Sequence, residues 1–128
     1  MPVDNFFEWR KIKGPGPKQP YAVAMKDGSP FGLAAIWENW QRRGTEEWVR
    51  TFAIITVAAN ELVSAIHDRM PVILHPNDHD RWLSNIEPDP RDLLVPYPSE
   101  PMTMWPISTR VNSPANDDPE LLTPVLAS

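Results

Sequence analysis

The 128 residues leave room for one domain with a modest hydrophobic core, and no apolar run approaches the roughly 20 residues that cross a membrane. The chain has no cysteine, which excludes disulfides, thiolate metal sites and a cysteine nucleophile within it. The net charge of −5 falls wholly on residues 84–128, because residues 1–83 carry ten basic and ten acidic side chains; this argues against an indiscriminate nucleic-acid binder but not against a local basic groove.

Sixteen prolines against five glycines predict many short strands and rigid turns rather than long helices. Aromatic residues predict a first strand over Phe6–Ile12, which ends at the Gly- and Pro-rich loop Lys13–Pro20. A second strand is expected over Pro20–Met25 and a third over Phe31–Trp37, with an Asp-Gly turn within Lys26–Pro30 between them. These three strands would form a meander.

The middle of the chain predicts one long strand followed by a short helix. The polar segment Glu38–Glu47 is expected to be a connection. Val49–Ala59 is continuous and β-branched, which predicts a strand buried on both faces. Asn60 is a suitable N-cap for a short helix that ends at His67, and the proline that follows directs the chain into a strand over Val72–Leu74.

The last third of the chain is punctuated by proline. Pro76 suits the first position of a helix that runs through Leu83. Short helical pieces are expected at Asp92–Val95 and Pro119–Leu122, and a strand at Met102–Ile107. The predicted fold class is therefore α+β, with a mixed sheet and short helices.

Glu8 stands between Phe7 and Trp9 in the first predicted strand, where alternation points its side chain away from theirs. If the two aromatic rings face the core, Glu8 is an ordinary solvent-facing carboxylate. If the sheet is covered on both sides, Glu8 lies in an apolar pocket, where its pKa would rise and it would donate a proton near neutral pH. The pattern alone favours the solvent-facing interpretation.

His67 opens the sequence His-Asp-Arg at the end of the predicted short helix. A histidine at that position commonly interacts with the C-terminus of the helix. In the alternative, the helix end and the nearby proline hold the imidazole rigidly at a cleft, with Asp68 or Arg69 tuning its protonation. The pattern alone again favours the structural interpretation.

Five segments occur here in one order: NFFEWRK…KQPYAV, FGLAAIWENW, FAIITVAAN, AIHDRMPVIL and WPISTRVNSPANDDPELLTPV. Together they closely resemble the SOS response-associated peptidase family, the abasic-site-sensing proteins of bacteria and their eukaryotic relatives. The resemblance runs from Pro2 almost to Val125. It implies an α+β fold in which a mixed, partly closed sheet, barrel-like or bifurcated, is surrounded by short helices.

The resemblance also implies chemistry on abasic sites in single-stranded DNA during the response to DNA damage. Family members remove their initiator methionine and expose a cysteine, whose amine and thiol capture the ring-opened sugar aldehyde as a thiazolidine. Glu8 matches the family's active-site glutamate and His67 its active-site histidine. Thr56 matches a hydroxyl position lining that pocket, and Asp68 and Arg69 follow the histidine in supporting roles. No metal or organic cofactor is implied, and a cytoplasmic, nucleoid-associated protein is expected.

The chain departs from the family pattern in lacking the Met-Cys-Gly-Arg start and the half of the domain that follows it. We therefore expect residues 1–128 to be the C-terminal portion of one such domain, with active-site strands and helices in 1–83 and a proline-rich segment in 84–128. Thiazolidine formation and self-processing are not expected without the cysteine. Strands that lack partners predict marginal stability or self-association.

A metal site is one alternative. His75 and His79 are four residues apart, with Asp78 and Asp80 beside them. Pro76 weakens this alternative, because His75 would then precede the predicted helix instead of lying on its face. A solvated helix start with aspartates near its N-terminus explains the same residues.

A non-catalytic module is another alternative, in which exposed tryptophans bind a peptide or stack on single-stranded bases. The candidate residues are Trp37, Trp40, Trp48 and Trp105. In the C-terminal segment, the residues predicted to contact the DNA backbone are Ser108, Arg110 and Asn112.

The start of the chain suggests a different nucleophile. Trimming of a methionine before proline would leave Pro2 with a free secondary amine, which can form an iminium with an abasic aldehyde. The strand from Pro2 to Glu8 would span about 20 Å, so the geometry for this reaction is poor.

Overall fold

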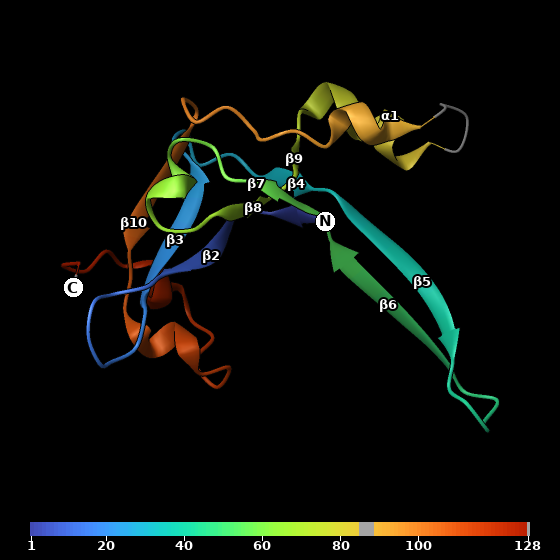
Figure 1. Ribbon diagram of the computed structural model, residues 1–128, viewed down its shortest axis with the longest axis horizontal. Helices are drawn as coiled ribbons and strands as arrows, with labels where there is room; N and C mark the ends of the chain where they lie inside the picture. Colours follow the sequence, from blue (N-terminus) through green and yellow to red (C-terminus); the bar gives the residue numbers. More distant parts are fainter. Residues whose placement is uncertain (85–88, 128) are drawn as a thin grey trace.

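In the computed structural model, which describes residues 1–84 and 89–127, short strands and short helices form a mixed α+β fold (Figure 1). The predicted fold class is confirmed at this level. The described strands form four small sheets, with orders β1-β4-β9, β10-β3-β2, β5-β6 and β7-β8, and all their pairings are antiparallel. None of these four sheets closes on itself, so the predicted barrel-like closure is not confirmed.

The β10-β3-β2 sheet contributes much of the hydrophobic core. β3 (Gln19–Met25) lies between β2 (Asn5–Arg10) and β10 (Met102–Pro106) and is buried along its whole length. The predicted Asp-Gly turn follows β3: Gly28 has φ of +74° and donates its N–H to the Met25 carbonyl at 3.0 Å. The predicted pairing of the first two strands is confirmed.

The predicted third strand is divided into two, and neither part pairs with β3, so the predicted three-stranded meander is wrong. β4 (Phe31–Leu33) pairs with β1 (Pro2–Val3) and β9 (Ile73–Leu74), whereas β5 (Ala35–Gln41) leaves this sheet and pairs elsewhere. A continuous apolar run does not reveal this division, because both halves have strand-forming residues and only their partners differ.

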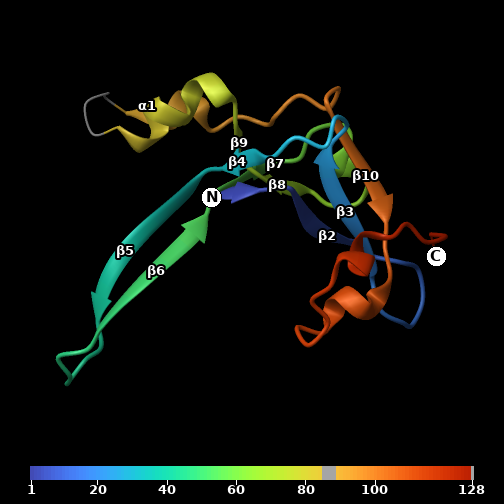
Figure 2. The ribbon, with the colours of Figure 1, turned by 180° about the vertical axis from the view of Figure 1, so that it is seen from behind.

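The partner of β5 is β6 (Trp48–Ile54), and the resulting hairpin corrects two predictions. The segment 38–41, expected to be part of a connection, belongs to β5. The predicted buried strand over 49–59 is wrong: β6 is largely exposed, and the strand is interrupted at Ile55 before β7 (Thr56–Ala58). Apolar sequence indicates burial only where another element covers the strand, and this hairpin projects away from the rest of the molecule (Figures 1 and 2).

Three strand breaks meet at one point, which we call the three-strand junction (Ala34, Ile55 and Val72). Ala34 separates β4 from β5, Ile55 separates β6 from β7, and Val72 separates β8 (Arg69–Pro71) from β9. Their backbones form a closed ring of hydrogen bonds: Ala34 N–H to Val72 O at 2.9 Å, Val72 N–H to Ile55 O at 2.8 Å, and Ile55 N–H to Ala34 O at 3.0 Å. The ring joins the hairpin to the strands that follow it.

The helical segments are short: η1 (Val63–Ala65), η2 (Pro76–Asp78), α1 (His79–Leu83), η3 (Pro90–Leu93), η4 (Thr109–Asn112) and η5 (Pro119–Leu122), where η denotes a 3-10 helix. Leu62 occupies the N-cap position of η1, but the Asn60 side chain accepts the N–H of the first residue of η1, Val63, at 3.0 Å and so fulfils the predicted capping contact from three residues away. Pro76 begins the helical stretch as predicted, and the piece expected at Asp92–Val95 starts two residues earlier. Among the described helices, none is long and apolar enough to cross a membrane.

Candidate functional site

Glu8 points from β2 toward the interior of the molecule. It shares a strand face with Phe6, because alternate residues of a strand point the same way. Phe6 packs edge-on against Phe31 in the main core, with ring centroids 6.2 Å apart. The Glu8 side chain is only 19% exposed, so the interpretation as an ordinary solvent-facing carboxylate is wrong.

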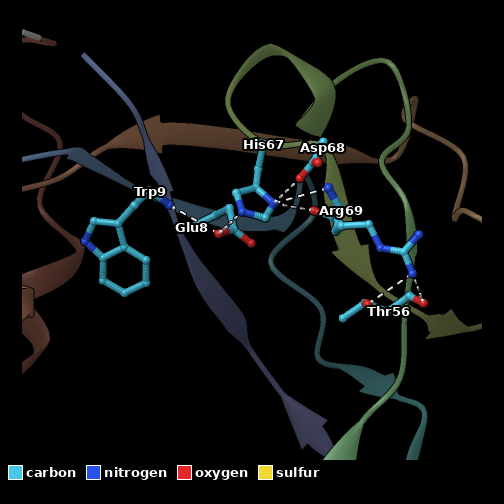
Figure 3. Close-up of polar contacts among 6 residues, drawn as sticks. All are labelled: Glu8, Trp9, Thr56, His67, Asp68 and Arg69. Atoms are coloured by element: carbon cyan, nitrogen blue, oxygen red, sulfur yellow. Dashed lines mark hydrogen bonds and ion pairs between the residues drawn. The ribbon is translucent and has the colours of Figure 1, made fainter. Parts of the chain in front are cut away.

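His67 faces Glu8 from the end of η1 (Figure 3). The helix is shorter than predicted, because η1 ends at Ala65 with Ile66 as its C-cap; the His67 N–H still donates to the Val63 carbonyl at 2.9 Å, which fixes the residue just beyond the helix. The Nε2 of His67 lies 3.7 Å from Glu8 Oε1, and the His67 side chain is 39% exposed. Residues far apart in sequence are thus brought together by the packing of η1 beside β2.

The backbone of Arg69 contacts the other ring nitrogen of His67. Nδ1 lies 3.2 Å from the Arg69 amide nitrogen and 3.0 Å from the Arg69 carbonyl oxygen. If Nδ1 accepts the amide proton, Nε2 carries a proton directed at the Glu8 carboxylate; if Nδ1–H donates to the carbonyl, Nε2 is open to accept a proton. Either tautomer of His67 is therefore satisfied without rotation of the ring.

This arrangement suits proton transfer between Glu8 and His67. Their 3.7 Å separation is longer than the roughly 2.6–3.2 Å of a proton-transfer contact. Catalytic hydrogen bonds are often long before substrate binds and tighten in the complex. The pair is therefore a candidate acid–base centre, with one group fixed on a strand and the other at a helix end.

The predicted supporting residues differ in how they contact this pair (Figure 3). The Arg69 guanidinium donates from Nη2 to the Thr56 carbonyl oxygen at 2.7 Å and to Thr56 Oγ1 at 3.2 Å, which connects β8 to β7. Thr56 is thus linked to His67 through Arg69. Asp68 Oδ1 lies 3.6 Å from His67 Nδ1, but its side chain is 91% exposed, so its charge is largely screened by water.

A cleft of about 670 Å³ opens beside His67. Its lining includes Asp68 and part of η1, together with an aromatic and basic group: Trp9, Arg10, Lys11 and Lys18. Sequence reasoning missed the three cations, which lie at neighbouring ends of β2 and β3, where Arg10 is paired with Gln19. The basic residues on either side of the loop between the first two predicted strands could have indicated this cluster of cations.

The three residues predicted to contact DNA from the C-terminal segment all have partners within the chain. Ser108 Oγ accepts the Arg110 N–H at 3.2 Å, and Arg110 Nη2 lies 2.8 Å from Asp118 Oδ2. Asn112 Oδ1 accepts a hydrogen bond from Trp9 Nε1 at 2.7 Å. Asn112 therefore brings η4 to the edge of the basic cleft, and a role of these residues in DNA binding stays a prediction.

The two histidines of the metal alternative have separate neighbours. The His75 ring packs on Tyr97 with centroids 4.7 Å apart, whereas His79 Nε2 lies 3.3 Å from the Leu74 carbonyl oxygen. Within residues 1–84 and 89–127, no group of three or more His, Cys, Asp or Glu side chains is placed to hold a metal ion. The metal alternative therefore gains no support.

The tryptophans of the binding-module alternative fall into two groups. Trp37, Trp40 and Trp48 are exposed on the hairpin. Trp105 is partly buried on β10 and donates its Nε1–H to the Leu122 carbonyl at 2.7 Å. Pro2, the other proposed nucleophile, is paired with Gly32 in the β1-β4 ladder and does not line the basic cleft.

Comparison with known proteins defines the class to which this fold and site belong. The family model for SOS response associated peptidase (SRAP) matches residues 1–114, and the chain belongs to this family. Among solved structures, a protein from Bacteroides thetaiotaomicron superposes with a TM-score of 0.86 at 31% identity, over 98% of this chain and 56% of that one.

Particular relatives extend the comparison to curated proteins. The abasic site processing protein YoqW of Bacillus subtilis is 38% identical over 125 residues, which cover 95% of this chain and 55% of YoqW. HMCES of Gallus gallus is 34% identical over 96% of this chain and 42% of its own length, and YedK of Escherichia coli is 33% identical over 96% and 55%. Both are also named abasic site processing proteins. The chain thus spans about half the length of the curated relatives it matches.

Proposed function

We propose that this chain provides the acid–base centre of an SRAP-type site that processes abasic sites in single-stranded DNA. The observation that carries the proposal is the pair of Glu8 and His67, whose Oε1 and Nε2 lie 3.7 Å apart beside a basic cleft. The names of the relatives support a role in handling abasic DNA. Because the chain spans about half of these relatives, the proposal concerns one part of the complete site.

The two groups would open the closed sugar ring of the abasic site. Opening the hemiacetal requires one proton on the ring oxygen and the loss of one from the C1 hydroxyl. Glu8, in its protonated form, donates the first, and His67 accepts the second. The ring C–O bond breaks, the aldehyde forms, and the proton on His67 returns to Glu8, so that no net proton is consumed.

The phosphates of the strand would bind in the basic cleft. Arg10, Lys11 and Lys18 provide three positive charges at its wall, and phosphate contacts supply most of the affinity of such interfaces. Trp9 offers a ring on which a neighbouring base can stack. Ser108, Arg110 and Asn112 would extend the backbone contacts beyond the Trp9 side of the cleft.

Thiazolidine formation needs a thiol that this sequence does not contain. In our proposal the thiol and its amine come from outside these 128 residues. This makes the acid–base contribution separately measurable, because free cysteine can replace the missing nucleophile. The amine condenses with the aldehyde to give an imine and water, and the thiol then adds to the imine carbon to close the ring.

The test measures thiazolidine formation between free cysteine and a single-stranded oligonucleotide with one abasic site, followed by mass spectrometry. We expect the chain to accelerate the reaction by about 10²-fold, a typical contribution of general acid–base catalysis, and Glu8→Gln or His67→Asn to abolish the acceleration. Glu47→Gln, an exposed carboxylate on the hairpin loop, is the matched control and should change nothing. Absence of acceleration while the oligonucleotide stays bound would refute the proposed chemistry.

A non-catalytic single-stranded DNA-binding role is the second candidate, and the basic cleft with Trp9 is the observation that favours it. This function requires the cations but not the Glu8–His67 pair. Equal affinity of wild type and Glu8→Gln for intact and abasic oligonucleotides, without any rate effect, would identify this role.

A further inference from the structure

The Trp9 indole at the basic cleft is held by the C-terminal segment of the chain. Its Nε1–H donates to Asn112 Oδ1 at 2.7 Å, across 103 positions of sequence. Because an indole N–H is only a donor, its partner must be the oxygen of the Asn112 amide. The Trp9 ring is turned away from His67 (Figure 3). The ring is therefore not placed to contact the sugar on which the Glu8–His67 pair would act.

The position of Asn112 relative to Trp9 is fixed by a closed set of contacts. Trp9 is opposite Pro20 in the β2–β3 ladder. The Pro20 carbonyl accepts the Ile107 N–H at 3.0 Å, and Ile107 is fully buried. η4 begins two residues after Ile107 and ends at Asn112. The strand that carries Trp9 and the helix that carries Asn112 are therefore attached to the same point of β3.

Contacts within residues 108–118 hold η4 in shape. Ser108 Oγ accepts the Arg110 N–H at 3.2 Å, and the Arg110 carbonyl accepts a hydrogen bond from Asn116 Nδ2 at 2.8 Å. The Arg110 guanidinium pairs with Asp118 Oδ2 at 2.8 Å. Because the chain on both sides of Asn112 is fastened, its oxygen meets the indole without the entropic cost of ordering a free loop.

We infer that Asn112 is a positioning residue, which orients the Trp9 ring for stacking on the base beside the abasic site. The inference rests on the proposed function, in which single-stranded DNA binds in the basic cleft. An abasic nucleotide has no base, so a stacking ring acts on a neighbouring nucleotide. A ring already held in one orientation loses little freedom when the base binds, which favours affinity. The C-terminal segment then contributes to recognition through Trp9.

A direct contact between Asn112 and the DNA backbone is a different role. Phosphate oxygens accept hydrogen bonds, so only Asn112 Nδ2 could contact them, whereas the bond to the indole uses Oδ1. A phosphate contact would be lost on substitution of Asn112 whether or not Trp9 carries a donor. Positioning, in contrast, has no further effect once the indole N–H is gone. A double-mutant cycle therefore distinguishes the two roles.

The cycle measures the affinity of the 128-residue chain for a single-stranded oligonucleotide with one tetrahydrofuran abasic analogue, by fluorescence anisotropy without cysteine. Asn112→Leu should weaken binding about three- to tenfold, because one hydrogen bond that orients the ring is lost. Trp9→Phe keeps an aromatic face but removes the donor. In that background Asn112→Leu should change the affinity by less than about 1.5-fold. Asn77→Leu, at an exposed asparagine outside the cleft, is the matched control and should change nothing.

Two further readouts separate positioning from a general loss of structure. Baseless spacers on both sides of the analogue remove the neighbouring bases, so Asn112→Leu should then bind as tightly as wild type. The indole Nε1–H signal of Trp9, assigned by its absence in Trp9→Phe, should move upfield in the NMR spectrum of Asn112→Leu. The indole signals of the other tryptophans should stay in place.

An Asn112→Leu protein that binds as tightly as wild type would overturn the inference. Additive losses in the cycle, or an equal loss with baseless neighbours, would also overturn it, because Asn112 would then act on the DNA or the fold without Trp9. Absence of binding by wild type would overturn both this inference and the proposed function. The expected affinities without acceleration of the cysteine reaction would refute the proposed chemistry alone, so the two failures are distinguishable.

Discussion

Asn60 is the buried polar residue that holds the start of η1, and therefore His67, in place. Its side chain accepts the Val63 N–H, donates from Nδ2 to the Tyr97 carbonyl at 2.7 Å and lies 3.4 Å from Met102 Sδ. With only 7% of the residue exposed, these contacts have no substitute in water. Asn60 thus joins the segment carrying His67 to β10 and to the chain near Tyr97.

Replacement of Asn60 by alanine should destabilise the fold by about 2–4 kcal/mol, because it removes a helix cap and leaves buried groups without hydrogen bonds. Urea denaturation followed by circular dichroism measures the change. Asn60→Asp retains the acceptor for the Val63 N–H but places a carboxylate oxygen against the Tyr97 carbonyl oxygen, so at neutral pH it should destabilise the fold at least as much as the alanine variant does. An Asn60→Ala protein as stable as the wild type would contradict this account.

Arg69 acts on His67 through two parts of its structure: its backbone contacts Nδ1, and its side chain fastens β8 to Thr56. Arg69→Ala leaves β8 paired with β7 but removes the side-chain tie to Thr56, so the backbone that contacts Nδ1 is held less firmly. We expect the acceleration of the cysteine reaction to fall by roughly 10- to 100-fold, because small errors in position are costly for catalysis. Arg69→Lys should recover part of this loss.

The readout for Arg69 must distinguish positioning from a general loss of structure. The ¹⁵N chemical shifts of the His67 imidazole report its tautomer and should change in Arg69→Ala while the thermal transition stays cooperative. If the rate falls but the imidazole signals stay the same, Arg69 does not position His67.

At the scale of elements, an ion pair joins α1 to η3. Arg81 donates to Asp92 through two bonds, at 2.7 and 2.6 Å, and Trp82 Nε1 donates to the Ala35 carbonyl at 3.3 Å. The hydrogen bonds from Arg81 lower the pKa of Asp92 below its ordinary value of 3.8. The short helix is thereby attached both to η3 and to the base of the hairpin.

The lowered pKa gives this ion pair a definite pH dependence. Because the folded pKa of Asp92 lies below the unfolded one, its stabilising contribution is complete above the ordinary value of 3.8 and is lost as the pH falls through the folded pKa. Asp92→Asn should therefore lower Tm slightly at pH 7, and the difference from wild type should disappear in strong acid. The effect is small, since surface ion pairs contribute little.

Calorimetry at several pH values between about 2 and about 7 measures the difference in Tm between Asp92→Asn and wild type. Asp117→Asn removes another exposed aspartate and serves as the control for the change in net charge. A gap between Asp92→Asn and wild type that widens toward low pH would contradict the assignment.

The elements differ in how far the sequence predicts them. β2, β3 and the turn at Gly28 follow from alternation and turn chemistry, which act over a few residues. The exposure of β6 does not, because whether an apolar strand is covered depends on other parts of the chain. Only the family resemblance predicts that Glu8 and His67 face each other. No local pattern encodes a contact between β2 and the segment that follows η1.

For the whole molecule, charge is distributed so that an acidic protein carries a local basic cleft. The net charge is −5, yet Arg10, Lys11 and Lys18 gather at one site. If all three contact phosphates of a single strand, log K should fall with log salt concentration with a slope of about −2. Fluorescence anisotropy of a labelled oligonucleotide measures this slope.

Variants of the cleft test how many of its charges take part. Lys11→Ser/Lys18→Ser should reduce the slope to about −0.7, because one phosphate contact remains. Lys26→Ser, at the turn after β3, removes an exposed cation elsewhere and should leave the slope unchanged. If Lys26→Ser changed the salt slope as much as the double variant in the cleft does, the oligonucleotide would be attracted to the protein's cations in general and would not bind in the cleft.

The three-strand junction has a consequence for the order of folding. Its ring joins residues 34, 55 and 72, so it closes only when three segments arrive together, and none of its bonds is local in sequence. The β5–β6 hairpin can form early, since its pairing spans a short loop, whereas β7 and β8 acquire their places only as the ring closes. Thr56 and Arg69 lie on those two strands. We therefore expect the support behind His67 to assemble late, in the same cooperative step that joins the sheets.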